Sequence, residues 1–158
     1  MHANYNIVVN IVAAPYHVPY SMTITNKGVI MEYAQIFEIF SAITLSCNKF
    51  IGEIPKVVGN ITRVLQLVNP SNNMLLGPTP PTLGDLTNLE MLDLSYNKLK
   101  RRIPSQLMQL NFLEVFNMSY NHLTRPIPKG QQFDTFENSS FDGNAGLCGM
   151  PLSKKCDD

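Results

Sequence analysis

One short pattern occurs four times in this chain, and its spacing limits the folds that the sequence can adopt. Each copy contains an asparagine followed seven residues later by a proline, and the asparagines Asn48, Asn73, Asn97 and Asn121 lie 25, 24 and 24 residues apart. Repeats of this length typically form solenoids, because each unit can bury its apolar edge only by stacking on its neighbours. The sequence therefore predicts a stacked fold with a binding surface rather than a catalytic centre.

The third copy shows the predicted local structure most clearly. Leu92 and Leu94 alternate with polar residues, which indicates a short strand with one face in the core and with Met91, Asp93 and Ser95 directed outward. The asparagine follows where the chain must turn away from the strand. A side-chain amide can both donate to and accept from backbone groups of adjacent coils, so we expect the four asparagines to form a buried ladder that supports the fold and does not bind a ligand.

Two departures from the pattern predict local strain. Pro70 occupies the strand position of Leu45 and Leu94, and because proline lacks a backbone donor we expect a weakened or interrupted strand there. Thr79 stands where the other copies have isoleucine. The glycines at positions 52 and 77 are replaced by Arg101 and Arg125 in the last two copies, which strains these turns if the position requires a positive φ.

The full pattern, LxxLxLxxNxLxGxIP, resembles the plant-specific subclass of leucine-rich repeats over residues 36–132. In that subclass the IP segment forms a second small sheet on the side of the solenoid. The resemblance implies an α/β-type solenoid, a right-handed superhelix with a short parallel sheet on its concave face. Few helices are expected, with most of the remaining chain in turns and 3-10 segments.

The flanking segments also resemble a known family. Residues 133–156 are similar to the C-terminal cap of plant leucine-rich-repeat receptor-like proteins and receptor kinases, and residues 20–33 to the segment that returns from an inserted island into the final four repeats of the receptor-like proteins. The chain is identified as a member of the plant leucine-rich-repeat receptor-like proteins. We expect an island re-entry segment and partial N-terminal cover (1–35), four repeats (36–132) and a cap (133–158). The resemblance also implies a Cys148–Cys156 disulfide, worth about 2 to 3 kcal/mol in the chain-entropy model, and a secretory route.

Composition restricts the class of partner. The chain has 12 basic and 12 acidic residues, so nothing in its net charge attracts nucleic acid or an anionic membrane. The sequence has neither an 18-residue apolar run nor a signal peptide, although the family has both, so we expect a chain truncated at both ends. Its expected location is the extracellular side of the plasma membrane, with membrane contact only through a missing C-terminal span.

Several residues are candidates for modification or recognition. Three sequons predict glycosylation at Asn60, Asn117 and Asn138. The predicted partner-binding residues are the outward strand positions Thr44, Ser46, Asn69, Met91, Asp93, Tyr96, Val115, Ser119 and Tyr120. Tyr96 and Tyr120 lie one repeat apart and should stack, either as an anchor for a partner or simply as residues that flank the strands.

Two further features leave alternatives open. Lys98, Lys100, Arg101 and Arg102 form a basic cluster with Arg125 one repeat later, which either recruits an acidic partner or is an ordinary solvated face. Cys47 is the unpaired cysteine, which either pairs between chains or replaces a residue such as serine.

The sequence lacks the patterns of an enzyme. His2, His17 and His122 lie in unrelated contexts, and no metal spacing, phosphate loop or nucleophile motif is present, so no cofactor is expected. The resemblance implies a non-catalytic ectodomain that perceives a pathogen-derived peptide, protein or glycan and recruits a co-receptor kinase ectodomain. The alternatives are a receptor kinase fragment in growth or development, a soluble wall-associated enzyme inhibitor, and a non-functional remnant.

Overall fold

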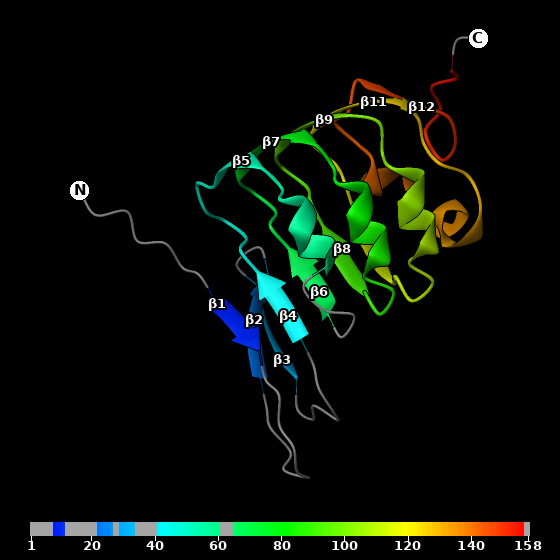
Figure 1. Cartoon of the computed structure of the whole chain (residues 1–158). Coiled ribbons are helices and arrows are strands. Elements are labelled where there is room, and N and C mark those ends of the chain that lie inside the picture. Colours follow the sequence, from blue (N-terminus) through cyan, green and yellow to red (C-terminus); the bar gives the residue numbers. More distant parts are fainter. Residues whose placement is uncertain (1–7, 12–21, 27–28, 34–40, 61–64, 157–158) are drawn as a thin grey trace.

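The chain forms a solenoid with two sheets along its sides (Figure 1). The computed structural model describes residues 8–11, 22–26, 29–33, 41–60 and 65–156. The first sheet has the order β1-β4-β6-β8-β10 and the second β12-β11-β9-β7-β5, so consecutive coils add one strand to each sheet. This is the solenoid expected from the repeats, with a parallel sheet on one side and a second sheet built by the segments that follow the asparagines.

The first sheet consists of short parallel strands with one antiparallel strand at its edge. Its members are β1 (Val8–Ile11), β4 (Ser41–Thr44), β6 (Leu65–Asn69), β8 (Met91–Asp93) and β10 (Val115–Asn117). The β1 strand pairs antiparallel with β4, and Val8 lies opposite Thr44. It therefore covers the edge of the first repeat.

The remaining strands and helices connect and extend the coils. The second sheet contains β5 (Ile51–Glu53), β7 (Met74–Pro78), β9 (Lys98–Arg101), β11 (His122–Pro126) and β12 (Gly146–Cys148). In the described part of the chain, five 3-10 helices lie between these strands in the sequence: η1 (Lys56–Asn60), η2 (Pro81–Asp85), η3 (Ser105–Gln109), η4 (Gln131–Thr135) and η5 (Asn138–Ser140). The strands β2 (Met22–Asn26) and β3 (Val29–Tyr33) pair antiparallel in a two-stranded sheet of their own. Within the described residues every helix is a 3-10 helix.

The expectation of a weakened strand at Pro70 is wrong. The β6 strand has five residues, ends at Asn69 and is longer than the three-residue β8 and β10, with the proline just beyond it. The amides of Leu45 and Leu94, at the equivalent position, donate to the next coil at 2.9 and 2.8 Å. Pro70 cannot make this bond, but its carbonyl oxygen accepts from the amides of two ladder asparagines. The proline therefore removes one hydrogen bond and leaves the strand intact.

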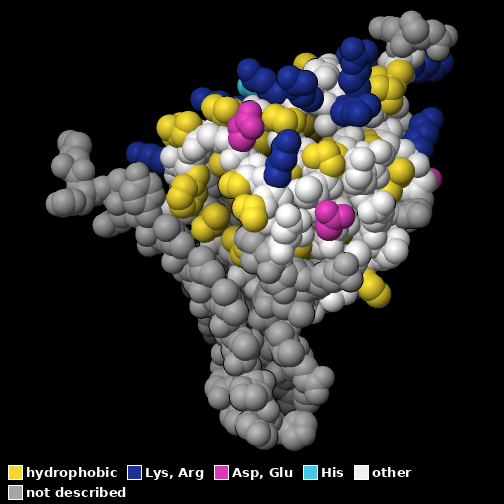
Figure 2. Space-filling view, in the orientation of Figure 1, with side chains coloured by type: hydrophobic (Ala, Val, Ile, Leu, Met, Phe, Trp, Pro, Cys, Tyr) yellow, Lys and Arg dark blue, Asp and Glu magenta, His cyan; other side chains and the backbone are white. Residues whose placement is uncertain are grey.

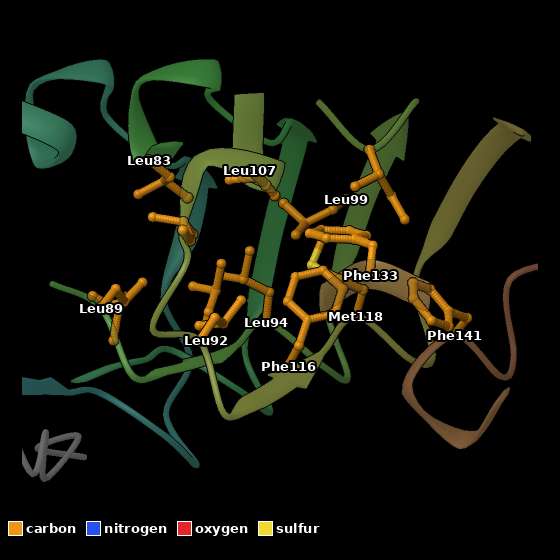
Figure 3. Close-up of a cluster of buried hydrophobic side chains, with 14 of the residues drawn as sticks. Leu83, Leu89, Leu92, Leu94, Leu99, Leu107, Phe116, Met118, Phe133 and Phe141 are labelled. Carbon is orange, nitrogen blue, oxygen red and sulfur yellow. The ribbon is translucent and has the colours of Figure 1, made fainter. Parts of the chain in front are cut away.

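Leucines fill the interior of the solenoid in layers. Leu92, Leu94, Leu99 and Leu107 of the third coil have no accessible surface, and Figure 3 shows them among the equivalent side chains of neighbouring coils. Each leucine contacts its own coil and those on either side, so the coils depend on one another for stability.

Aromatic side chains close the C-terminal end of this core. Phe116 of the fourth coil has ring centroids 4.9 Å from Phe133, 5.1 Å from Phe136 and 5.8 Å from Phe141. Phe133 and Phe141 are almost completely buried, and their position at the end of the leucine layers is visible in Figure 3. The residues after position 132 thus remove the last coil's apolar face from water.

Candidate binding surface

The repeated asparagines hold neighbouring coils together through buried hydrogen bonds. Asn121 Nδ2 donates to the carbonyl oxygens of Leu94 in the preceding coil and Met118 in its own, at 2.9 and 3.1 Å. Its Oδ1 accepts from the backbone N of Leu99 at 3.0 Å. The same pattern occurs at Asn73, Asn97 and Asn144. These amides are committed to backbone groups and hold the turns that carry the surface residues.

The asparagine ladder has a member in the cap that the sequence analysis missed. Asn144 lies 23 residues after Asn121, is 6% exposed and donates from Nδ2 to the carbonyl oxygens of Met118 and Phe141 at 3.0 and 2.9 Å. The spacing was a signal for this role, although the surrounding residues lack the leucine pattern. The cap therefore begins as a fifth coil and adds β12 beside β11.

A second set of polar side chains turns back onto the first sheet's own backbone. The Oδ1 atoms of Asn69, Asp93 and Asn117 accept from the backbone N two residues later at 3.0 to 3.1 Å. Asn69 and Asp93 are 1% and 4% exposed, and Ser119 is 3% exposed. Asn69, Asp93 and Ser119, three of the nine predicted partner-binding residues, are therefore buried. The tight turn after each strand leaves backbone amides without a strand partner, and nearby polar side chains form hydrogen bonds with them.

The other predicted contact residues are accessible to different degrees. Thr44, Ser46 and Met91 are half-buried, whereas Val115 on β10 is 44% exposed. Met91 lies opposite Val115 in the register of the first sheet. The last two coils thus provide a small apolar area beside polar neighbours, the usual composition of a protein-binding surface.

Tyr96 and Tyr120 form the clearest aromatic feature on this surface. Their ring centroids lie 4.4 Å apart with planes inclined by 13°, and the side chains are 47% and 50% exposed, so the predicted stacking is confirmed. Both residues have a φ of 53° and lie in the turn between the first and second sheets. Gly143 occupies the equivalent turn of the cap, where a Cβ atom would lie 2.6 Å from Tyr120 Cδ1. The missing side chain leaves room for the tyrosine ring.

The predicted modification sites differ in accessibility. Asn60 and Asn138 are exposed, but Asn117 is half-buried and its Oδ1 accepts from both the backbone N and Oγ of Ser119. The Cys148–Cys156 disulfide is present, with an S–S distance of 2.04 Å. Cys47 is an exposed free thiol, and its Sγ accepts from Asn72 Nδ2 at 3.4 Å.

The described residues contain no cluster of three or more histidine, cysteine or acidic side chains suited to a metal ion. In the same part of the chain, the longest helices have five residues and none could cross a membrane.

Comparison with known proteins identifies the repeat and the family. A family model described as Leucine Rich Repeat matches residues 88–110. Receptor-like protein 9DC3 of Solanum pimpinellifolium is 47% identical over 141 residues, which cover 89% of this chain and 16% of that protein. The receptor-like protein Cf-9 homolog of Solanum lycopersicum is 48% identical over 137 residues, or 87% of this chain and 16% of that protein. The chain thus spans 16% of the length of these curated relatives.

Solved structures show the same architecture. The BIR2 ectodomain of Arabidopsis thaliana superposes with a TM-score of 0.67 at 37% identity, covering 72% of this chain and 59% of that one. A chain of the BIR3–SERK2 complex from the same plant gives 0.55 at 31% identity and covers 73% of each chain. The HAESA receptor kinase ectodomain in complex with an IDA peptide hormone gives 0.62 at 37% identity, covering 75% of this chain and 19% of that one. The chain belongs to the plant leucine-rich-repeat receptor-like proteins, a non-catalytic receptor family, and forms a segment of their ectodomain.

Proposed function

We propose that this segment recruits a co-receptor kinase ectodomain within a cell-surface receptor that perceives pathogen-derived molecules. The observation that carries the proposal is the stacked, half-exposed Tyr96–Tyr120 pair. Tyrosine provides a large contact area with few rotatable bonds, and stacking removes part of the freedom that each ring would otherwise lose on binding. The pair is thus partly preorganised for a partner.

The surroundings of the pair support a protein partner. Both tyrosines lie beside the last two strands of the first sheet, where Val115 is exposed and Met91 is half-buried. Aromatic and methionine side chains are enriched at protein interfaces. The turn backbone is fixed by coil-to-coil bonds, among them Tyr96 N to Ser119 O at 3.0 Å and Tyr120 N to Asp142 O at 2.7 Å. A partner would therefore meet a rigid surface.

Two related structures indicate the kinds of molecules that such a surface binds. One is the BIR3–SERK2 complex, and the other is the HAESA ectodomain with an IDA peptide hormone. Similar solenoids therefore bind both another protein chain and a peptide. We propose that a complete receptor containing this segment uses distant coils for its ligand and the coils around Tyr96 and Tyr120 for the second chain, on the extracellular side of the plasma membrane.

The test is a direct binding measurement with the secreted 158-residue chain. The SERK2 ectodomain is the probe, and we expect saturable binding at micromolar concentrations. The double variant Tyr96→Ser/Tyr120→Ser should bind at least about tenfold more weakly, because central aromatic residues in interfaces contribute roughly 2 kcal/mol or more.

Phe112→Ser is the matched control. Phe112 is 64% exposed, follows η3 and lies away from the tyrosine turn, so its loss should leave the affinity unchanged. Absence of SERK2 binding by the unmodified chain would refute the proposed recruitment. Equal affinities of the unmodified chain and the tyrosine variant would show that the tyrosine pair is not the contact.

A further inference from the structure

A row of positive side chains lies on the second sheet. We call it the basic ridge and define it as Lys98, Lys100, Arg101, Arg102 and Arg125, all of which are exposed. The first three belong to β9 and the last to β11. Figure 2 shows lysine and arginine side chains gathered along this edge of the solenoid.

The ridge is a local excess of charge in a neutral chain. The sequence has 12 basic and 12 acidic residues, but β9 (KLKR) and β11 (HLTRP) contain no acidic residue. Glu90 and Glu114 of the same coils precede the strands of the first sheet instead. No ion pair neutralises the ridge within the part of the chain that the structure describes, so its potential is available to an acidic partner.

Two arginines of the ridge have a backbone conformation that favours glycine. Arg101 has a φ of 71° and Arg125 a φ of 80°, whereas glycine occupies this turn in the first two coils, with φ of 118° at Gly52 and 80° at Gly77. A left-handed conformation costs a residue with a side chain roughly 1 to 2 kcal/mol. Strained residues of this kind cluster at functional sites. The presence of arginine at this strained position in two successive coils is consistent with a role for the guanidinium groups.

The arrangement of the ridge favours a hydrophilic, extended polyanion. Arg101 lies opposite Leu123 on the neighbouring strand β11, so Arg125 is displaced from Arg101 by one strand and by two residues along it. The two guanidinium groups thus offer two forked donors along a diagonal of the sheet. A guanidinium group pairs with a carboxylate through two parallel hydrogen bonds. Among the described residues, neither β9 nor β11 carries an exposed large apolar side chain, and Leu76 of β7, opposite Lys98, is 38% exposed. This is a small apolar area for insertion into a membrane.

We propose that the basic ridge binds a linear acidic polysaccharide of the polyuronate class, which carries one carboxylate on each sugar. Arg101 and Arg125 each pair with a carboxylate of the same polymer chain, and Lys98, Lys100 and Arg102 add screened attraction along its length. Arg101 and Arg125 belong to β9 and β11, whereas Tyr96 and Tyr120 lie in the turns before these strands, so separate variants can test the two contacts.

The experiment uses the 158-residue chain and polygalacturonate as the probe. Binding is measured at physiological and at high salt, and we expect the affinity to fall steeply with salt. The double variant Arg101→Gly/Arg125→Gly should bind about tenfold more weakly, since each exposed ion pair typically changes an affinity by up to about fivefold. The same variant should melt at a higher temperature than the unmodified chain, because glycine relieves the backbone strain. Weaker binding together with higher stability cannot result from misfolding.

Lys49→Gln/Lys56→Gln is the control, since it removes the same charge from exposed positions in the first coil. We expect its affinity to remain within about twofold of the unmodified chain. Three results would overturn the proposal: unchanged polygalacturonate binding by the arginine variant, equal binding of polyglutamate, and stronger binding of phosphatidylserine vesicles than of polygalacturonate. The second result would indicate an acidic peptide and the third a lipid surface.

Discussion

Replacement of Thr79 by valine should stabilise the solenoid. Thr79 is 1% exposed, and its Oγ1 has no hydrogen-bond partner. The equivalent residues of the next two coils are Ile103 and Ile127, each 2% exposed and part of the leucine core. The second coil thus buries a hydroxyl group at a position that the repeat otherwise fills with hydrocarbon.

The expected gain follows from the loss of that hydroxyl. A buried polar group without a partner costs about 1 to 3 kcal/mol, and an additional buried methyl group contributes about 0.8 kcal/mol. The two contributions overlap, because the same substitution of hydroxyl by methyl removes the polar group and adds the apolar one, so the expected gain lies in the lower part of their combined range. We expect the free energy of unfolding to rise by about 1 to 2 kcal/mol, which raises the melting temperature by roughly 3 to 6 °C for a domain of this size.

Urea denaturation followed by circular dichroism measures this change, and calorimetry provides the melting temperature. Thr82→Val is the matched control, because the Thr82 hydroxyl donates to the carbonyl oxygen of Lys56 at 2.7 Å. Its loss should lower the stability by about 0.5 to 1 kcal/mol. If Thr79→Val left the stability unchanged or reduced it, the assignment of an unsatisfied hydroxyl to this site would be wrong.

Four other substitutions test the turns and the asparagine ladder by the same denaturation assay. Arg101→Gly and Arg125→Gly should each stabilise the chain by about 0.5 to 1 kcal/mol, because relief of the positive φ exceeds the added entropy of the unfolded chain; destabilisation by both would contradict this. Asn121→Ala should cost about 3 kcal/mol or more, since it leaves buried groups of two coils without partners, and a loss below 1 kcal/mol would exclude a structural ladder. Gly143→Ala should lower the free energy of unfolding by about 1 to 3 kcal/mol and move the Tyr120 ring, because a Cβ atom would lie 2.6 Å from that ring. Unchanged stability together with unchanged tyrosine fluorescence would argue against the close packing.

Features that recur at a fixed spacing could be predicted from the sequence. Tyr96 and Tyr120 were expected to stack because equivalent positions of adjacent coils must lie side by side, and their centroids are 4.4 Å apart. Arg101 and Arg125 were expected to be strained because they replace glycines, and both have a positive φ. In each case the position of the residue within the repeat determines its contact or its backbone conformation.

The conformation of individual side chains could not be predicted in this way. Alternation along β8 placed Asp93 on the outer face, but its Oδ1 turns back to the backbone N of Ser95 and the residue is 4% exposed. Pro70 was expected to interrupt a strand that in fact ends one residue earlier. Asn144 lies outside the leucine pattern, so its part in the ladder became visible only when the cap was seen to continue the coil.

The sequence alone determined the solenoid, its core and the residues that repeat along it, because a period of about two dozen residues allows the apolar positions to be buried only by stacking. The tertiary structure decided which polar residues remain available to a partner. At each turn a polar side chain bonds either to water or to a backbone amide that has no other partner. The local backbone geometry, rather than the residue type, decides between the two. The tertiary structure also showed that β1 pairs with the strand of the first coil, because this contact joins segments that the repeat pattern does not relate.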